Sequence, residues 1–147
     1  MTWSYIAGFF DGEGTLCHNG RGYRVCITQT NKEVLKKIME FTGYGNVVEI
    51  TKRKSHWKDS WLYFISKQEN IYRFLIGISK DVIVKKHKVE ETIPILKMVI
   101  KKMKEKNKKR IKLYRRAKYL RKNGLTYREI GKILKIDFGQ ARRIILK

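Results

Sequence analysis

The sequence is short of proline and cysteine. Proline occurs only as Pro94, where we expect it to kink a helix or to begin a new one. Cys17 and Cys26 are too few for a disulfide framework or a zinc site. Because intracellular proteins keep their thiols reduced, we expect two free thiols. The alternative is a bridge across the hairpin that is predicted to contain both residues.

Long apolar runs are also missing. No stretch approaches the length that crosses a membrane, and the N-terminus lacks a charged region followed by an apolar one. Neither a membrane-spanning helix nor a signal peptide is therefore predicted. We expect an intracellular protein, cytoplasmic in a prokaryote or organellar, that is not secreted.

Acidic residues are scarce as well. Thirteen Asp and Glu stand against 35 Lys and Arg, which gives a net charge of +22. The imbalance is concentrated in residues 101–147, which hold nineteen basic and three acidic residues. Such an excess indicates a polyanionic partner. A solvated basic face and an anionic membrane surface are the alternatives, and nucleic acid without a membrane partner is our prediction.

The apolar pattern predicts an α+β fold with an antiparallel sheet. Trp3, Ile6, Ala7 and Phe10 recur at helical spacing, and the glycines after them end that helix. Alternating runs on either side of residues 19–22 predict a β-hairpin. The same signals continue the order as a helix, a second hairpin and a third helix, which gives αββαββα.

The C-terminal region has a different pattern. We place a first domain at residues 1–103, a basic linker or helix extension at 104–112, and a small all-α domain at 113–147. In the last domain, "TYRE" and "DFGQ" are capping boxes that would each begin a helix. Three short helices with a tight last connection are typical of a helix-turn-helix, with Gly131 at the crossing. Any small three-helix bundle shares this pattern, but the basic charge favours the DNA-binding motif.

The stretch "YIAGFFDGEGT" breaks two local rules, because glycine is a poor helix former and acids disfavour a helix C-terminus. Such conflicts mark functional sites. Gly8 and Gly12 share a helix face and let a second backbone approach closely. A copy of the helix packed there would bring Asp11 and Glu13 together with the partner's acids, and Mg²⁺ would neutralise them beside a phosphate. The alternative is a plain helix end with solubilising acids.

The same stretch resembles the LAGLIDADG motif of homing endonucleases, with Ile6 to Gly14 at its nine positions. The element order after it is similar to that family's half-saddle, and the resemblance covers residues 1–103. It implies a site-specific endonuclease, of the kind encoded by introns, that makes double-strand breaks in a long DNA target. Only one motif is present, so we expect a homodimer and a near-palindromic target. The implied dimer interface comprises Ile6, Ala7, Gly8, Phe10, Asp11 and Gly12.

The resemblance also implies catalytic roles. Glu13 and the carbonyl of Gly12 would bind Mg²⁺ or another divalent cation such as Mn²⁺. Asp11 would support them by hydrogen-bonding the helix end. Gln29 would order solvent near the metal, and Lys85 would belong to the same solvent network, with Lys86 as the alternative.

Residues that contact DNA are expected on the strands, in the linking turns and in the last helix. Strands of such a saddle lie in the major groove, where Arg21 and Arg24 are suited to guanine. Lysines and arginines of the second turn would contact phosphates. The whole predicted set is Asn19, Arg21, Arg24, Cys26, Thr28, Asn46, Lys52, Arg53, Lys54, Lys58, Gln140, Arg142 and Arg143.

Two other functions are compatible with the residues. One is a non-cleaving binder on the same fold, either an RNA maturase for intron splicing or a transcription regulator. The other is a helix-turn-helix protein with an unrelated sensor domain, which would leave the acidic stretch without a reason. Carboxylates that face phosphate favour the enzyme, because a pure binder gains nothing from them.

Overall fold

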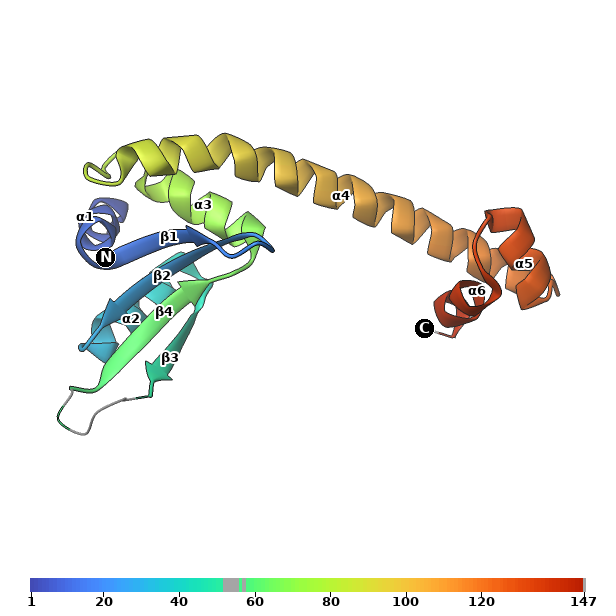
Figure 1. Ribbon diagram of the computed structural model, residues 1–147, viewed down its shortest axis with the longest axis horizontal. Coiled ribbons are helices and arrows are strands. Elements are labelled where there is room, and N and C mark those ends of the chain that lie inside the picture. The colour runs from blue at the N-terminus through green and yellow to red at the C-terminus, as the bar shows by residue number, and fades with distance from the viewer. Residues whose placement is uncertain (52–55, 57, 147) are drawn as a thin grey trace. The chain divides into compact units, whose positions relative to one another are not determined.

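The computed structural model describes residues 1–51, 56 and 58–146, and it divides into two compact units, residues 1–100 and 101–147 (Figure 1). Lys52, Arg53 and Lys54, three of the expected phosphate contacts, lie outside the described residues. Each unit has its own hydrophobic core.

The first unit has the predicted order αββαββα, followed by the start of a long helix. Its elements are α1 (Trp3–Glu13), β1 (Gly14–His18), β2 (Tyr23–Gln29), α2 (Lys32–Thr42), β3 (Asn46–Ile50), β4 (Ser60–Ile65), α3 (Gln68–Ile78) and the beginning of α4 (Lys86–Lys122). The four strands form one antiparallel sheet in the order β1-β2-β4-β3. The predicted fold class is confirmed.

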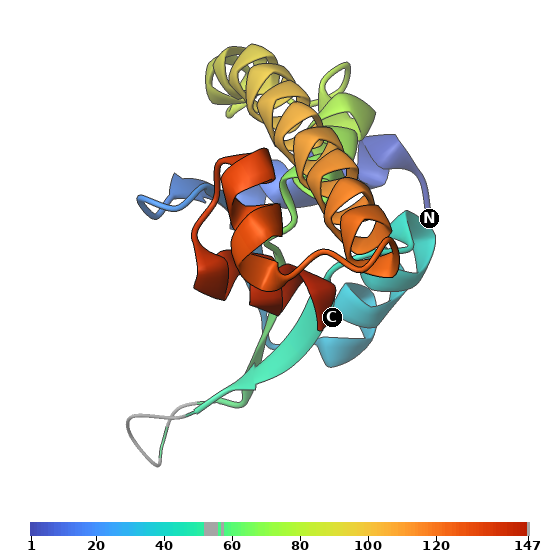
Figure 2. The ribbon, with the colours of Figure 1, turned by 90° about the vertical axis from the view of Figure 1, so that its right-hand side faces the viewer.

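The sheet has one covered and one open face. Strand side chains alternate between the two faces, and Val25, Ile27, Tyr63 and Ile65 are buried on the same one. Together with helix residues such as Phe74 they form a single core. The helices α1, α2 and α3 lie on that side of the sheet (Figures 1 and 2). None of the described helices of this unit covers the other face of the sheet.

The second unit is built from the end of α4 with α5 (Tyr127–Leu134) and α6 (Phe138–Ile145). Ala117, Ile130, Ala141 and Ile144 are its buried core. A Cβ on Gly131 would lie 2.9 Å from the Ile136 carbonyl oxygen, so only glycine admits this close approach of the turn.

The two predicted capping boxes differ in the structure. In the first, the Thr126 N–H donates to Glu129 at 2.7 Å and the Glu129 N–H donates back to the Thr126 hydroxyl at 3.4 Å. In the second, Asp137 accepts from the Gln140 N–H at 2.9 Å, but no return bond is found among the described residues. The second prediction was therefore half right, because Asp137 is an ordinary N-cap.

Helix α4 excludes one of the two alternatives predicted for Pro94 and corrects the prediction of the first of three short helices. No new helix begins at Pro94, and residues 104–112 lie within one helix of 37 residues. Proline leaves the Glu90 carbonyl without its helical donor. Both residues are exposed, so water can satisfy that oxygen. None of the described helices combines the length and the apolar content needed to cross a membrane.

Tyr63 fastens the loop between α2 and β3 to the sheet. Its hydroxyl donates to the Tyr44 carbonyl oxygen at 3.0 Å and lies 3.1 Å from the Thr42 hydroxyl. Gly45 makes room for the ring, because a Cβ there would lie 2.4 Å from it. Burial raises the pKa of Tyr63 to about 12.

We expect Tyr63→Phe to lower the free energy of unfolding by about 1 kcal/mol, because the buried hydrogen bonds are lost. Unfolded tyrosine ionises near pH 10 and folded Tyr63 near 12, so wild-type stability should fall across that interval. Tyr63→Phe should fall less steeply there, with the remaining slope due to Tyr44, whose pKa burial also raises to about 12. Urea unfolding at pH 8 to 12 measures this. Tyr72→Phe is the control, and an equal loss in both variants would contradict the assignment.

Candidate active site

Helix α1 presents two different faces. Thr2 caps its N-terminus by accepting the Tyr5 N–H at 3.2 Å. Ile6, Ala7 and Phe10 are completely buried in the core of the first unit. On the other side Gly8 and Gly12 are exposed, and apart from the adjacent residues and the backbone of α1 itself, no atom of the described residues lies within 4 Å of the place where either would carry a Cβ.

This arrangement corrects half of the expected dimer interface. Ile6, Ala7 and Phe10 cannot contact a partner chain, because their side chains pack inside their own unit. Gly8 and Gly12 keep the open backbone that a second helix would need. Tyr5 and Phe9, which share their side of the helix, stack at 6.0 Å between ring centroids.

Asp11 hydrogen-bonds the backbone that leads into α4. Its Oδ2 accepts the N–H groups of Ile83 at 2.6 Å and Val84 at 3.2 Å, and its Oδ1 accepts that of Lys85 at 3.0 Å. We expected Asp11 to hydrogen-bond the end of its own helix. It hydrogen-bonds the backbone just before α4 instead. Burial by itself would raise the pKa of Asp11, but the three N–H groups and the charge of Lys85 outweigh it and hold the pKa below 3.8.

The side chain of Lys85 hydrogen-bonds the C-terminal end of α1. Its Nζ donates to the carbonyl oxygen of Phe10 at 3.0 Å and also to that of Asp11. A cation at a helix C-terminus opposes the negative end of the dipole, and α1 has no basic residue of its own in its last turn. The ammonium group therefore lies beside the turn that carries Gly12 and Glu13.

Glu13 is the last residue of α1 and is exposed to solvent. The described part of the chain offers its carboxylate no hydrogen-bond or ion-pair partner. The next residue fixes its position, because a Cβ on Gly14 would lie 2.1 Å from the Phe10 ring. Only glycine lets the chain pass there directly from α1 into β1.

Gln29 lies at the same end of the sheet. Gly14 pairs with Ile27, so the register places Gln29 two residues further on, level with the end of α1. Its side-chain oxygen accepts from the N–H and hydroxyl of Thr30 at 2.8 and 3.2 Å. The structure thus brings Glu13, Gly12, Lys85 and Gln29 to one end of the unit.

In the part of the chain that the structure describes, these side chains do not form a complete metal centre by themselves. Among the described residues, no three His, Cys, Asp or Glu side chains are grouped so as to hold an ion. A single carboxylate and a backbone carbonyl are nevertheless hard oxygen donors of the kind that suit Mg²⁺. That cation commonly takes one or two carboxylates and completes its shell with water and phosphate oxygens.

Most residues expected to contact DNA in the first unit lie on the open sheet face or in the turns. Arg24, Cys26, Thr28 and Asn46 alternate with the buried positions and so belong to the open face. Asn19 and Arg21 are exposed in the turn between β1 and β2, where Asn19 accepts the Arg21 N–H at 3.2 Å. Lys58 is exposed as well.

Sequence reasoning missed the β4 residues of this face, Ser60, Leu62 and Phe64. The run "SWLYFI" is apolar on both faces, so its alternation gives little contrast. Arg24 lies over the Phe64 ring at 4.3 Å. Cys17 and Cys26 are free thiols on the same face, and burial raises the pKa of Cys26.

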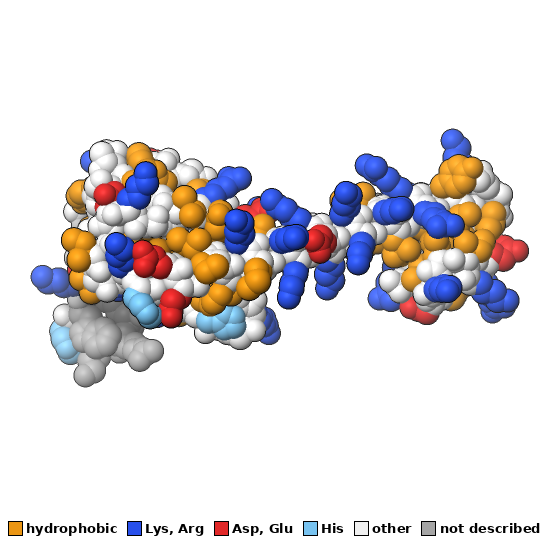
Figure 3. Space-filling model, turned by 90° about the horizontal axis from the view of Figure 1, so that it is seen from above, with side chains coloured by type: hydrophobic (Ala, Val, Ile, Leu, Met, Phe, Trp, Pro, Cys, Tyr) orange, Lys and Arg blue, Asp and Glu red, His pale blue; other side chains and the backbone are white. Residues whose placement is uncertain are grey.

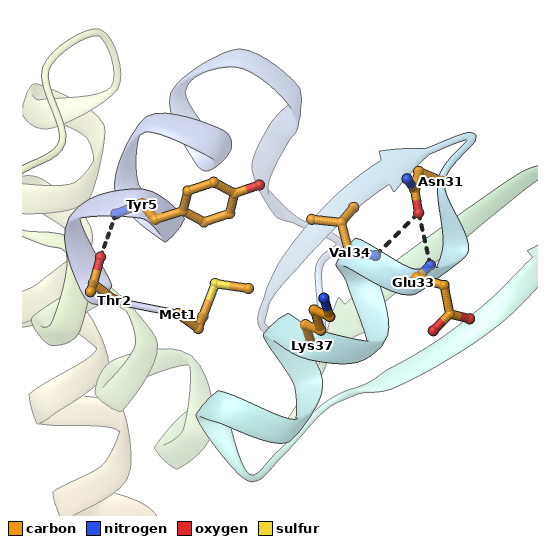
Figure 4. A pocket seen from close by; sticks show the side chains of 7 residues that line it. All are labelled: Met1, Thr2, Tyr5, Asn31, Glu33, Val34 and Lys37. Carbon is orange, nitrogen blue, oxygen red and sulfur yellow. Dashed lines mark hydrogen bonds between the residues drawn. The ribbon is translucent and has the colours of Figure 1, made fainter.

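A hollow of about 500 Å³ lies elsewhere, between the N-terminal ends of α1 and α2 (Figure 4). Thr2 and Asn31, the N-caps of the two helices, are part of its wall, and Lys37 projects into it. Neither Asp11 nor Glu13 lines it. The hollow is therefore separate from the acidic end of α1.

Residues 3–78, just over half of the chain, match the family model described as LAGLIDADG-like domain. The chain therefore belongs to this family. No curated protein gives a significant sequence match.

Several solved structures share the fold. The archaeal intron-encoded homing endonuclease I-Vdi141I complexed with DNA is 22% identical, with a TM-score of 0.51, over 97% of this chain and 93% of that one. The homing endonuclease I-CvuI in complex with its target in the presence of Ca²⁺ is 18% identical, with a TM-score of 0.51. The meganuclease I-SmaMI bound to uncleavable DNA is 16% identical over 68% of this chain and 38% of that one, with a TM-score of 0.50. The I-CvuI match covers 65% of each chain.

We expect Asp11→Asn and Glu13→Gln to separate a structural acid from a chemical one. Asp11→Asn should lower the free energy of unfolding by about 1–2 kcal/mol, because three hydrogen bonds to a half-exposed charge are weakened. Glu13→Gln should leave stability unchanged. Urea unfolding of the two variants measures the difference.

The pH dependence gives a second readout. Because the pKa of Asp11 is lowered by folding, its contribution is full above pH 3.8 and is lost as the pH falls further. The stability gap between wild type and Asp11→Asn should therefore close in acid. A gap that does not narrow as the pH falls below 3.8, or a Glu13→Gln variant that is equally destabilised, would contradict these roles.

Proposed function

We propose that this chain is a homing endonuclease that acts as a homodimer and makes double-strand breaks in a long, near-palindromic DNA target. The observation that carries the proposal is the free carboxylate of Glu13 at the end of a helix whose glycine face is open. Membership of the LAGLIDADG family and structural neighbours solved with DNA support it. Hydrolysis depends on a divalent cation, with Mg²⁺ the expected ion.

Dimerisation uses the exposed face of α1. Gly8 and Gly12 allow a second α1 to approach closely, and Tyr5 is 49% exposed beside them. Ile83 and Val84, which Asp11 holds next to the helix, are 81% and 78% exposed. Burial of these apolar side chains favours association. A two-fold axis at α1 would bring the two Glu13 side chains together.

The residues at the end of α1 would have different roles in catalysis. Glu13 and the Gly12 carbonyl hold the cation, which when bound supplies an activated water and neutralises charge on the phosphate. Lys85 keeps a positive charge beside this turn. Gln29 lies at the same end of the sheet and can orient solvent. Asp11 has no free oxygen for the chemistry and fixes the geometry instead.

The second unit extends the contact with DNA. Helices α5 and α6 are joined by a tight turn in which Lys135 has a left-handed φ of +53°. The tight turn supports our proposal of a helix-turn-helix, in which α6 would enter the major groove. Arg142 and Arg143 are exposed on α6, and Gln140 lies near its start. Lys and Arg side chains also project along α4 (Figure 3).

Cleavage tests the proposal directly. With Mg²⁺, the wild-type chain should cut a plasmid library of random inserts at one near-palindromic sequence, and EDTA should abolish cutting. Glu13→Gln should bind that sequence and lose cleavage by at least about 100-fold, as for loss of a catalytic group. Tight, salt-sensitive binding without cleavage would instead assign the chain to the non-cleaving binders, including an RNA maturase.

The role of the second unit has its own test. Replacing Arg142 and Arg143 by Gln should shorten the DNase footprint on the selected target and reduce the salt dependence of binding by about two charges. The control replaces Lys101 and Lys102 by Gln, which removes the same charge from α4. The control should lower affinity and keep the footprint length. Identical footprints for both variants would contradict a helix-turn-helix contact.

A further inference from the structure

The open face of the sheet has a composition unlike the rest of the chain. Charged residues make up 33% of the sequence, yet only one of the described residues on this face, Arg24, is charged. The pairing register assigns eleven described positions to the face: Thr15, Cys17, Arg24, Cys26, Thr28, Asn46, Val48, Ile50, Ser60, Leu62 and Phe64. Such a surface is poorly suited to phosphate, which is bound mainly by lysine and arginine.

The register also orders these residues in rows across the strands. Thr28, Leu62 and Val48 pair in one row, and continuing the β1–β2 register by one residue places Glu13, at the end of α1, next to this row. The next row outward contains Cys26, Phe64 and Asn46. Arg24 lies one row further still, paired with Cys17. The apolar rows are thus nearest to Glu13 and the cation is farthest.

Each type of side chain has a matching group in the major groove. Apolar side chains contact the 5-methyl group of thymine, asparagine pairs with adenine, and arginine pairs with guanine. Val48 is 41% exposed, and Leu62 and Phe64 are half-buried, so all three can present methyl or ring carbons to a groove.

The side chain of Arg24 is oriented by its neighbour and can contact one base edge. Its guanidinium stacks on the Phe64 ring at 4.3 Å, and its Nε is buried without a hydrogen-bond partner among the described residues. Stacking reduces the number of side-chain conformations, while the terminal nitrogens can still point away from the sheet. A planar group fixed in this way suits paired hydrogen bonds to one base edge.

We propose that the open face reads A·T pairs through thymine methyl groups, which Val48, Leu62 and Phe64 contact, and that Arg24 reads one guanine farther from Glu13. The inference rests on the proposed function and specifies its DNA substrate. Arg24 lies four residues before Thr28 on β2, which is about 14 Å along a strand or about four base pairs of duplex. Each half-site should therefore have thymines near the cleavage centre and a guanine about four base pairs outward.

This readout also separates DNA from RNA. Uracil lacks the 5-methyl group, and the major groove of an RNA duplex is too deep and narrow for side chains to read. The aliphatic and aromatic side chains of the open face would therefore contribute no binding free energy to an RNA duplex. The open face thus favours a DNA target over the maturase alternative.

Substitution of deoxyuridine for thymine is the direct test, because it removes only the methyl group. The full chain is first used to select bound duplexes from a random library in Ca²⁺. Fluorescence anisotropy then compares the selected duplex with copies in which single thymines are deoxyuridine. We expect affinity to fall about fourfold at each contacted position, the effect of one buried methyl group.

Substitutions on the open sheet face test whether its side chains cause the thymine preference. Val48→Asn and Leu62→Asn should each remove the thymine preference at one position of a half-site, with little change in the urea midpoint because neither side chain is in the core. Ile76→Asn is the matched control, since Ile76 is 46% exposed on α3 and should leave the preference intact.

The outcomes are distinguishable. Equal affinity for thymine and deoxyuridine at every position, in a chain that binds a selected duplex, would overturn this inference and leave the proposed function standing. Failure to select any duplex, or preference for RNA, would overturn both.

Discussion

The structure depends on a reciprocal charged contact between the end of α1 and the start of α4. Asp11 accepts three N–H groups from residues 83–85, and Lys85 donates back to the last carbonyls of α1. Each helix terminus leaves unpaired backbone groups whose partial charge needs an opposite partner. The exchange gives hydrogen-bond partners to two carbonyls at the end of α1 and to three N–H groups just before α4. It also fixes Glu13 at a defined place, where its carboxylate is exposed and unpaired.

Acidic and basic residues are unevenly distributed over the molecule. Carboxylates are few, and of the two at the end of α1 only Asp11 is engaged by backbone N–H groups, while Glu13 is left free. The positive charge lies on α4, the turns and the second unit, where phosphate contacts give affinity without sequence information. The open sheet face is nearly uncharged, which leaves it free for base edges. Under the proposed function, affinity and specificity would be carried by different surfaces of one chain.

Local sequence was sufficient for most of the fold and for part of the site. Helical spacing gave α1 and its core stripe, and the glycine spacing gave the open face of Gly8 and Gly12. The same stripe already placed Ile6, Ala7 and Phe10 in the core. The predicted dimer contact nevertheless included them, because it took residues from both sides of the helix, and only the exposed side can contact a partner. The partners of Asp11 lie 72 to 74 residues away in sequence, so no local pattern could identify them. Leu62 and Phe64 were missed because β4 is apolar on both sides, and Pro94 begins no new helix because the Glu90 carbonyl that it leaves without a donor can bind water.

The central claim is that two copies of Glu13 meet at a metal site on DNA. Its most direct test is a crystal structure of the full chain bound to a selected duplex in Mn²⁺, with anomalous scattering used to locate the ions. The account predicts two chains related by a two-fold axis through α1, with Mn²⁺ coordinated by Glu13 from each chain and by phosphate oxygens at the centre of the site. A single chain on the DNA, or ions placed away from both Glu13 side chains, would contradict it.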